Sequence, residues 1–314
     1  MSHRWAAPTA LADALGVLAT DPGARPVAGG TDLVVGSRQG RRPLPDSIVA
    51  IDRIPELAGQ RADPDGSLVL GALTSHAWLA SADAVVSSWT ALADAAAIVG
   101  SPATRGTGTL GGNIMNASPA AETVGPLIVA GAVATLVSST AKRQLAVAEV
   151  ATGPGRTAAT AGELLLTEVR VPAPPEGSGS AYVRLEYRAA MEIAVVGATA
   201  FVALDGSAGG DGSAARATIR EARIALTAVA PTIIRATAAE ERLAGRSPDA
   251  AAFAAAGQAA AAAASPISDV RASAEYRRAM IEVVVARALS AAARRAAGED
   301  VPVPASRWAH GQEV

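Results

Sequence analysis

Residues 105–122 read RGTGTLGGNIMNASPAAE, and this stretch carries most of the information about the fold. Four glycines fall within residues 105–112, and glycine disfavours the interior of both helices and strands. We therefore expect a loop here, with positive φ at Gly112 in its Gly-Gly pair. A glycine pair flanked by hydroxyl and amide side chains suits a phosphate-binding clamp. A long surface loop without a ligand is the alternative.

A second glycine pair lies in the segment AGGTDL, residues 28–33, between an apolar run at 25–28 and a predicted helix at 31–38. Adjacent glycines permit positive φ and a close approach to a bulky ligand, and we expect this at Gly30. The start of a helix offers N–H groups and a positive dipole end, which suit a pyrophosphate. The segment matches neither G-x-G-x-x-G nor the P-loop pattern. A tight turn without a ligand is again the alternative.

The composition excludes several classes of protein. Of the 314 residues, 50% are hydrophobic and 18% are charged, which excludes a disordered chain. The net charge of -2 and the lack of a basic block argue against nucleic-acid binding. The absence of cysteine excludes disulfides, thiol catalysis and iron–sulfur ligation by this chain, and three scattered histidines argue against a metal site. We see no signal peptide and no membrane span, and we expect a cytoplasmic protein.

The order of predicted elements changes along the chain. The first half alternates short strands with helices, whereas the second half has its strands first and its helices afterwards, as α+β domains do. We expect these helices to cover one face of the second-half sheet. A Pro-, Gly- and Ser-rich segment predicts a domain boundary near 175, and the residues from Gly298 onward predict a loose tail. The predicted strands are 47–51, 68–72, 132–138, 163–171, 181–188, 193–204 and 217–229, and the predicted helices are 84–99, 119–132, 231–244, 248–265 and 271–297.

Several segments resemble one protein family. The string GTGTLGGNIMNASPAAE at 106–122 resembles the flavin-binding signature of the FAD subunit of molybdenum hydroxylases, the xanthine dehydrogenase and carbon monoxide dehydrogenase group. The resemblance runs through nearly the whole chain and keeps the order of the segments. The other segments are ARPVAGGTDL at 24–33, GELLLTEVRVP at 162–172, YRAAMEIAVVGA at 187–198, VAPTIIRA at 229–236 and SAEYRRAMIEVVVARAL at 273–289.

The resemblance implies a particular α+β architecture. Residues 1–175 would form a two-lobed FAD-binding domain of the vanillyl-alcohol-oxidase (PCMH) type, with lobes at about 1–55 and 56–175. Residues 176–297 would form a smaller α/β C-terminal domain, a sheet covered by helices. Residues 298–314 would be a flexible tail.

The resemblance also implies FAD as the cofactor and a set of residues that bind it. One segment would enclose the pyrophosphate, a second would hold the ribityl–phosphate portion, and Glu122 would bind ribose or ribityl hydroxyls. Arg184 would approach the flavin ring, although a solvated strand residue is the alternative for it. The family usually has Asp at the positions of Glu122 and Glu192 and Lys at that of Arg184, and Arg and Lys differ in geometry. The two segments comprise Ala28, Gly29, Gly30, Thr31, Asp32 and Leu33, and Thr109, Leu110, Gly112 and Asn113.

The function implied by the resemblance is electron transfer within a complex. This chain would be the FAD-binding medium subunit of a molybdenum-containing hydroxylase or dehydrogenase, in a heterotrimer with a small [2Fe–2S] subunit and a large molybdenum-cofactor subunit. FAD would pass electrons to an external acceptor such as NAD, oxygen or a quinone, and this chain would hold no catalytic residue and no metal. The alternatives are a self-contained FAD-dependent oxidase or dehydrogenase of the same fold, and a redox-silent scaffold. His76 has no role in this assignment and is expected at the surface or packed on a helix.

Overall fold

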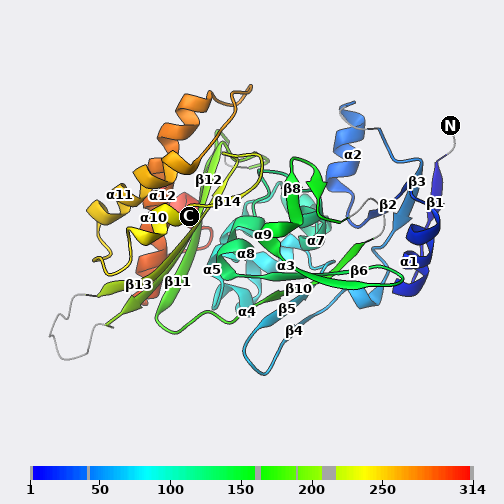
Figure 1. Ribbon diagram of the computed structural model, residues 1–314, viewed down its shortest axis with the longest axis horizontal. Helices are drawn as coiled ribbons and strands as arrows, with labels where there is room; N and C mark the ends of the chain where they lie inside the picture. The colour runs from blue at the N-terminus through cyan, green and yellow to red at the C-terminus, as the bar shows by residue number, and fades with distance from the viewer. Residues whose placement is uncertain (1–2, 41–42, 160–163, 189, 207–216, 312–314) are drawn as a thin grey trace. The chain divides into compact units, whose positions relative to one another are not determined.

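The computed structural model describes residues 3–40, 43–159, 164–188, 190–206 and 217–311 (Figure 1). The chain forms two compact units, and the mixture of helices and mostly antiparallel sheets confirms the predicted α+β class. Unit 1 comprises residues 1–78, 102–118 and 131–172, and unit 2 comprises residues 79–101, 119–130 and 173–314. Within the described part of the chain, none of the helices combines the length and the apolar character that a membrane span requires.

Unit 1 contains a small parallel sheet and a larger antiparallel sheet. The parallel sheet has the order β1-β3-β2, and the antiparallel sheet has the order β4-β5-β10-β6-β7. Its elements are β1 (Arg4–Ala6), α1 (Leu11–Thr20), β2 (Ala24–Val27), α2 (Thr31–Arg38), β3 (Ser47–Ala50), the 3-10 helix η1 (Pro55–Leu57), β4 (Gln60–Ala62), β5 (Leu68–Gly71), α6 (Pro102–Thr107), α7 (Leu110–Met115), β6 (Val133–Val137), β7 (Lys142–Ala146), α9 (Val147–Val150), β8 (Ala151–Gly153), β9 (Arg156–Thr157) and β10 (Leu165–Val171).

Apolar side chains from α1, β3 and η1 form one core of unit 1. Leu18, Val49 and Leu57 are buried there, together with Leu165 of β10. Leu165 belongs to the antiparallel sheet, so this core joins the two sheets of the unit. Strand β2 joins this core through Ala24, whereas α2 contributes no buried residue to it.

Unit 2 is built on one antiparallel sheet with the order β11-β12-β13-β14. Helix α3 (His76–Ser81) begins in unit 1 and ends in unit 2. The elements of unit 2 are α4 (Asp83–Val86), α5 (Thr90–Ala97), α8 (Val124–Ala130), β11 (Ser178–Leu185), β12 (Val196–Asp205), β13 (Thr218–Thr227), β14 (Ile234–Arg235), α10 (Thr237–Glu241), α11 (Ala250–Ala263), α12 (Ala274–Ala296) and α13 (Ala305–Ala309).

Helices cover both faces of this sheet, whereas the sequence predicted cover on one face only. On one face, α12 packs along β11 and β12 and α11 packs on α12, as Figure 1 shows. On the other face, α5 packs on β11, and α8 packs on β12 and β13. The reason lies in β12, where residues 196–203 are all buried, so that neither face of the strand meets solvent.

The two compact units do not follow the chain in a simple order. Residues 79–101 and 119–130, which carry α5 and α8, precede the predicted boundary near 175 and nevertheless pack in unit 2. The last crossing between the units lies at Pro172–Ala173, within the Pro-rich segment. The predicted two-lobed division of residues 1–175 stays a prediction.

The predicted loose tail contains an ordered helix. Residues 305–309 form α13, and Ala305 and Ser306 are buried. The main-chain N–H of Ala305 donates to Asp94 Oδ1 at 2.9 Å, and Arg295 donates to the carbonyl oxygens of Val301 and Pro302. A charged pair, with one member from α5 and one from α12, therefore holds the tail. The polar composition of the tail does not predict this contact.

That pair is the buried salt bridge between Asp94 and Arg295. The guanidinium is bidentate, with Nη1 2.6 Å from Oδ2 and Nη2 3.0 Å from Oδ1. Asp94 has no exposed surface and also accepts the N–H of Tyr182 at 3.0 Å. Burial raises the pKa of Asp94, and the charge of Arg295 opposes that rise.

We predict that Asp94→Asn destabilises the protein by about 3–5 kcal/mol, because it leaves the buried cation of Arg295 without a carboxylate. Urea unfolding of the full chain measures the change. The matched control is Glu299→Gln, an equal change in the Arg294–Glu299 pair, whose side chains are 45% and 48% exposed. Its expected cost is about 0–1 kcal/mol. Equal costs for both variants would contradict the prediction.

Candidate functional site

The first glycine pair forms the turn between β2 and α2. Gly30 has a φ of +66° and precedes the first residue of α2, as the sequence predicted. Gly29 has a different constraint, since a Cβ there would lie 1.9 Å from the carbonyl oxygen of Thr107. The two glycine-rich segments therefore touch each other through main chain. Ala28 packs on the core of unit 1, Thr31 and Leu33 are half-buried, and Asp32 is exposed.

The second glycine-rich segment is helical, and the prediction of a loop over 105–113 was wrong. Helices α6 and α7 run through it, separated by Gly108 and Thr109. The Thr109 side chain caps α7, where its Oγ1 accepts the N–H of Gly112 at 3.0 Å. Gly112 lies inside this helix and lacks the positive φ that the sequence predicted for it. Capping and tertiary contacts override the weak helix propensity of glycine.

The main chain of α7 is fixed to the residues that directly follow β5. The N–H of Leu110 donates to the carbonyl oxygen of Thr74 at 2.8 Å, and that of Gly111 donates to Ala72 at 2.9 Å. A Cβ on Gly111 would lie 2.8 Å from both Cβ and the carbonyl oxygen of Ala72. Leu110 itself is fully buried, so its side chain serves the core. Gly111, which is not among the predicted FAD-binding residues, is thus the glycine that this packing requires.

His76, at the start of α3, is buried beside this segment. Only 3% of its surface is exposed, and its main-chain N–H donates to the carbonyl oxygen of Gly108 at 3.2 Å. Its Nδ1 atom is buried without a hydrogen-bond partner in the described structure. Burial lowers the pKa of His76 to about 4, and the charge of Arg105 adds to the shift. His76 therefore packs as a neutral imidazole at neutral pH.

Glu122 and Arg184, the remaining predicted site residues, meet in unit 2. Arg184 has no exposed surface, and its Nη1 donates to Glu122 Oε1 at 2.6 Å. The same guanidinium forms an ion pair with Glu186 and donates to the carbonyl oxygen of Glu192 at 3.2 Å. The second carboxylate oxygen of Glu122 accepts a short hydrogen bond from the Tyr182 hydroxyl. Arg184 is thus not the solvated strand residue that the alternative described.

The ionisation of this cluster follows from its burial. Burial raises the pKa of Glu122, and the positive charge of Arg184 opposes that rise. Burial by itself lowers the pKa of Arg184, but the negative charges of the carboxylates beside it raise the pKa by more. The guanidinium therefore stays charged. The pKa of Tyr182 is raised by burial and by the charge of Glu122. One cation therefore faces two carboxylates and a neutral phenol.

Tyr182 and Glu186 escaped the sequence analysis, although a signal for both was present. Residues 182, 184 and 186 alternate along β11 and beyond it, so they share one side of the strand. That side faces α5 and α8, and a Cβ on Gly197 would lie 2.5 Å from the Tyr182 hydroxyl. Period-two spacing of Tyr, Arg and Glu in a buried strand indicates a polar cluster, because such side chains need partners.

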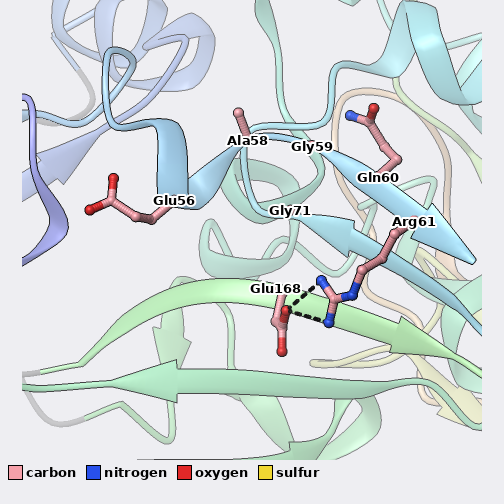
Figure 2. A pocket seen from close by; sticks show the side chains of 7 residues that line it. All are labelled: Glu56, Ala58, Gly59, Gln60, Arg61, Gly71 and Glu168. Atoms are coloured by element: carbon pink, nitrogen blue, oxygen red, sulfur yellow. Dashed lines mark hydrogen bonds and ion pairs between the residues drawn. The ribbon is translucent and has the colours of Figure 1, made fainter. Parts of the chain in front are cut away.

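A hollow of about 230 Å³ also lies in unit 1, and Figure 2 shows the side chains that line it. Its charged and amide side chains have partners. Arg61 reaches Glu168 at 3.3 Å and Asp63 at 3.4 Å. Glu56 accepts the N–H of Leu11 at 3.2 Å, and Gln60 donates to Thr74 at 3.1 Å. The hollow thus lacks the convergent, unpaired polar groups of a ligand site. Its lining consists of Glu56, Ala58, Gly59, Gln60, Arg61, Gly71 and Glu168.

Comparison with known proteins gives two family matches along the chain. The model described as the FAD binding domain in molybdopterin dehydrogenase matches residues 1–174. The model of the CO dehydrogenase flavoprotein C-terminal domain matches residues 180–292.

Individual relatives match over nearly their whole length. The carbon monoxide dehydrogenase medium chain of Hydrogenophaga pseudoflava is 33% identical over 90% of this chain and 93% of its own. A putative xanthine dehydrogenase FAD-binding subunit of Escherichia coli is 30% identical over 92% and 95%. Among solved structures, carbon monoxide dehydrogenase from H. pseudoflava has a TM-score of 0.86 and 31% identity, over 94% of this chain and 98% of that one.

We predict that Gly29→Ala destabilises unit 1 by about 1–3 kcal/mol, because the new methyl group pushes the Thr107 carbonyl away. Urea unfolding measures the loss. Gly36→Ala is the control in helix α2, which follows the turn, because a Cβ there would meet nothing within 4 Å. It should stabilise the chain by about 0.5–1 kcal/mol, since alanine is the better helix former. A neutral Gly29→Ala would show that the two segments do not touch.

We predict that His76 makes stability depend on pH. The unfolded chain binds its proton near pH 6.5 and the folded chain only near pH 4, so stability is lost as pH falls through this window. The expected loss is about 3 kcal/mol, on the order of 1.4 kcal/mol for each unit of pKa. Unfolding free energies at pH 7, 5.5 and 4.5 measure it. His76→Gln should flatten this part of the profile, and an unchanged profile would disprove the assignment.

Proposed function

Since this chain belongs to the family of FAD-binding subunits of molybdenum-containing dehydrogenases and hydroxylases, we propose that it is the electron-transfer subunit of such a complex. The chain binds FAD and is part of an oxidoreductase in which another subunit oxidises the substrate. In the proposed function, FAD receives electrons from iron–sulfur clusters on a partner subunit and passes them to an external acceptor. The observation that carries the proposal is the match of both family models, in order, along a chain without cysteine.

The turn at Gly29 and Gly30 fits the pyrophosphate of FAD. Gly30 bends the main chain through a positive φ at the head of α2, an eight-residue helix whose first N–H groups have no acceptor within the helix. The positive end of the helix dipole favours a phosphate there. We propose that Ala28, Gly29 and Gly30 and the first turn of α2, Thr31 to Leu33, hold the pyrophosphate through main-chain N–H groups.

The second segment fits a more limited role than the sequence alone predicts. The N–H groups of residues 110–113 are all engaged within unit 1, where those of Gly112 and Asn113 reach Thr109. Main-chain donors of α7 are thus occupied, and we propose that the Thr109 hydroxyl and the Asn113 side chain serve the ribityl–phosphate portion. Gly112 would then contribute space, since it is exposed and carries no side chain. Leu110 supports the segment from the core.

We propose that Glu122 and Arg184 serve the flavin. Nε and Nη1 of Arg184 donate to Glu186, Glu122 and the carbonyl oxygen of Glu192. Nη2 lies in the ion pair with Glu186 but is buried without a hydrogen-bond partner among the described residues. We propose that Arg184 acts chiefly through its charge and through Glu122. FAD supplies the capacity to accept electrons one or two at a time. A cation held near a flavin favours its reduced form and raises its potential. Arg184 would supply that cation, and the carboxylates around it would limit the effect.

The partners follow from what this chain lacks. Without cysteine it holds no iron–sulfur cluster, so we propose a small [2Fe–2S] subunit that delivers electrons and a large subunit that carries the molybdenum cofactor. The relatives named as medium chains support this arrangement. The external acceptor would be NAD, oxygen, a quinone or another carrier, and the cytoplasmic location stays a prediction.

We predict that co-expression with the two partner subunits yields a three-subunit complex whose flavin is bleached by the substrate of the complex. The isolated chain should be yellow, with one FAD per polypeptide, and should show no bleaching with any such substrate. Flavin absorbance near 450 nm, recorded anaerobically, measures both.

Gly30→Val is the control for this experiment, because a β-branched residue cannot adopt the φ of +66° without strain. It should abolish FAD binding in the isolated chain and in the complex. Turnover of an organic substrate by the isolated chain would instead support a self-contained flavoenzyme. A chain that takes up no FAD from excess cofactor would refute the proposal.

A further inference from the structure

The polar main-chain groups of Arg184 point away from the sheet, because β11 lies at its edge. One hydroxyl satisfies both of them. The N–H of Arg184 donates to Ser306 Oγ at 3.1 Å, and the same hydroxyl donates to the Arg184 carbonyl oxygen at 3.1 Å. Ser306 is 1% exposed, so water does not compete for these bonds. A residue of the chain's last helix thus fixes the main chain of Arg184.

His310 adds a second bond to the same carbonyl. Its Nε2 lies 2.7 Å from the Arg184 oxygen and donates to it, because a carbonyl only accepts. The other ring nitrogen, Nδ1, then lacks a proton and accepts a short hydrogen bond from Arg287 Nη1 of α12. The imidazole therefore bridges α12 and the strand that carries Arg184.

The segment that supplies these side chains is itself anchored. We call residues 305–310 the C-terminal clamp. Its first N–H donates to Asp94, and Trp308 lies beneath the guanidinium of Arg294, 4.9 Å from the ring centroid. The clamp also lies beyond residue 292, where the match to the C-terminal family model ends. Its contacts are therefore a feature of this chain that the family match does not describe.

We propose that Ser306 and His310 are positioning residues, which orient the Arg184 guanidinium toward Glu122 by fixing the main chain of Arg184. The proposal rests on the role of Arg184 at the flavin given above. Arg184 is the penultimate residue of β11, and the residues after it carry two of its partners, Glu186 and Glu192. Holding its N–H and its C=O fixes both the base of the side chain and the start of that segment.

The test measures FAD affinity, by flavin fluorescence, and flavin reduction potential in the full chain. His310→Leu removes both bonds of the imidazole, and Ser306→Ala removes those of the hydroxyl. Each should weaken FAD binding by roughly three- to tenfold, because only part of the cost of the two lost hydrogen bonds falls on the bound state. Each should also shift the potential. His310→Gln is the conservative variant, because its amide both donates and accepts, and it should stay within about twofold of the parent chain.

Two further variants separate positioning from general support. Arg294→Gln removes the contact with Trp308 without touching Arg184, and it should leave affinity and potential within about twofold. Arg184→Lys keeps the charge and removes the planar fork. In that background the effect of His310→Leu should fall below about twofold, because the two changes act through the same group. Melting temperatures identify any variant that does not fold.

The outcomes are distinguishable. Suppose that Arg184→Lys changes FAD affinity or reduction potential, while His310→Leu and His310→Gln give the same affinity and potential as each other. The positioning role is then wrong and the proposed function stands. Undiminished effects of His310→Leu in the Arg184→Lys chain would also overturn it. If Arg184→Lys moves neither quantity, the role of Arg184 at the flavin fails, and the clamp has nothing to position. If Arg184→Lys does not fold, the rate of amide hydrogen exchange at residues 184–188 tests the positioning role instead. His310→Leu should accelerate this exchange and His310→Gln should not.

Discussion

A guanidinium without exposed surface is the constraint on which unit 2 depends. Removing a cation from water costs several kcal/mol unless carboxylates and hydrogen bonds replace the lost solvation. Arg184 therefore needs Glu122 from the segment before α8, Glu186 from the residues after β11, and a carbonyl oxygen from Glu192. The segment before α8 and the segment after β11 thus meet at one side chain, and each is fixed by that meeting. The carboxylates that keep Arg184 charged also weaken the electric field of that charge. They therefore limit the proposed rise in the reduction potential of the flavin.

The edge of the same sheet shows how unit 2 uses side chains in place of a further strand. The outward main-chain groups of β11 at residues 180, 182 and 184 are taken by Arg295, Asp94 and Ser306 in turn. An uncovered edge would invite pairing with another chain. Here the cover comes from α5, α12 and the C-terminal clamp, so closing the sheet edge and placing Arg184 are consequences of the same contacts.

In unit 1 the corresponding constraint is a contact between main chains. The two glycine-rich segments approach so closely at Gly29 and Thr107 that no side chain fits between them. Gly111 lets α7 pack on Ala72 in the same way. Gly29 and Gly111 permit close packing of one part of the protein on another, whereas Gly30 supplies the turn before α2 that suits a phosphate. The glycines of a binding signature thus divide into those that shape the protein and those that leave room for the ligand.

The sequence by itself determined the family and the cofactor, through the resemblance of segments such as residues 106–122 to a known family. It also determined the order of most elements, because local patterning is read without three-dimensional contacts. It predicted α2 at 31–38, β10 within 163–171 and α12 within 271–297, since periodicity and capping are local. The tertiary structure alone decided the rest. It formed helices within residues 105–113 through a Thr109 cap and bonds to the residues that follow β5, and it placed 79–101 and 119–130 on the sheet of unit 2. It also ordered the tail through Asp94 and brought Arg184 to Glu122, 62 residues away. Such contacts depend on which buried group lacks a partner once the chain has folded, and no local pattern contains that information.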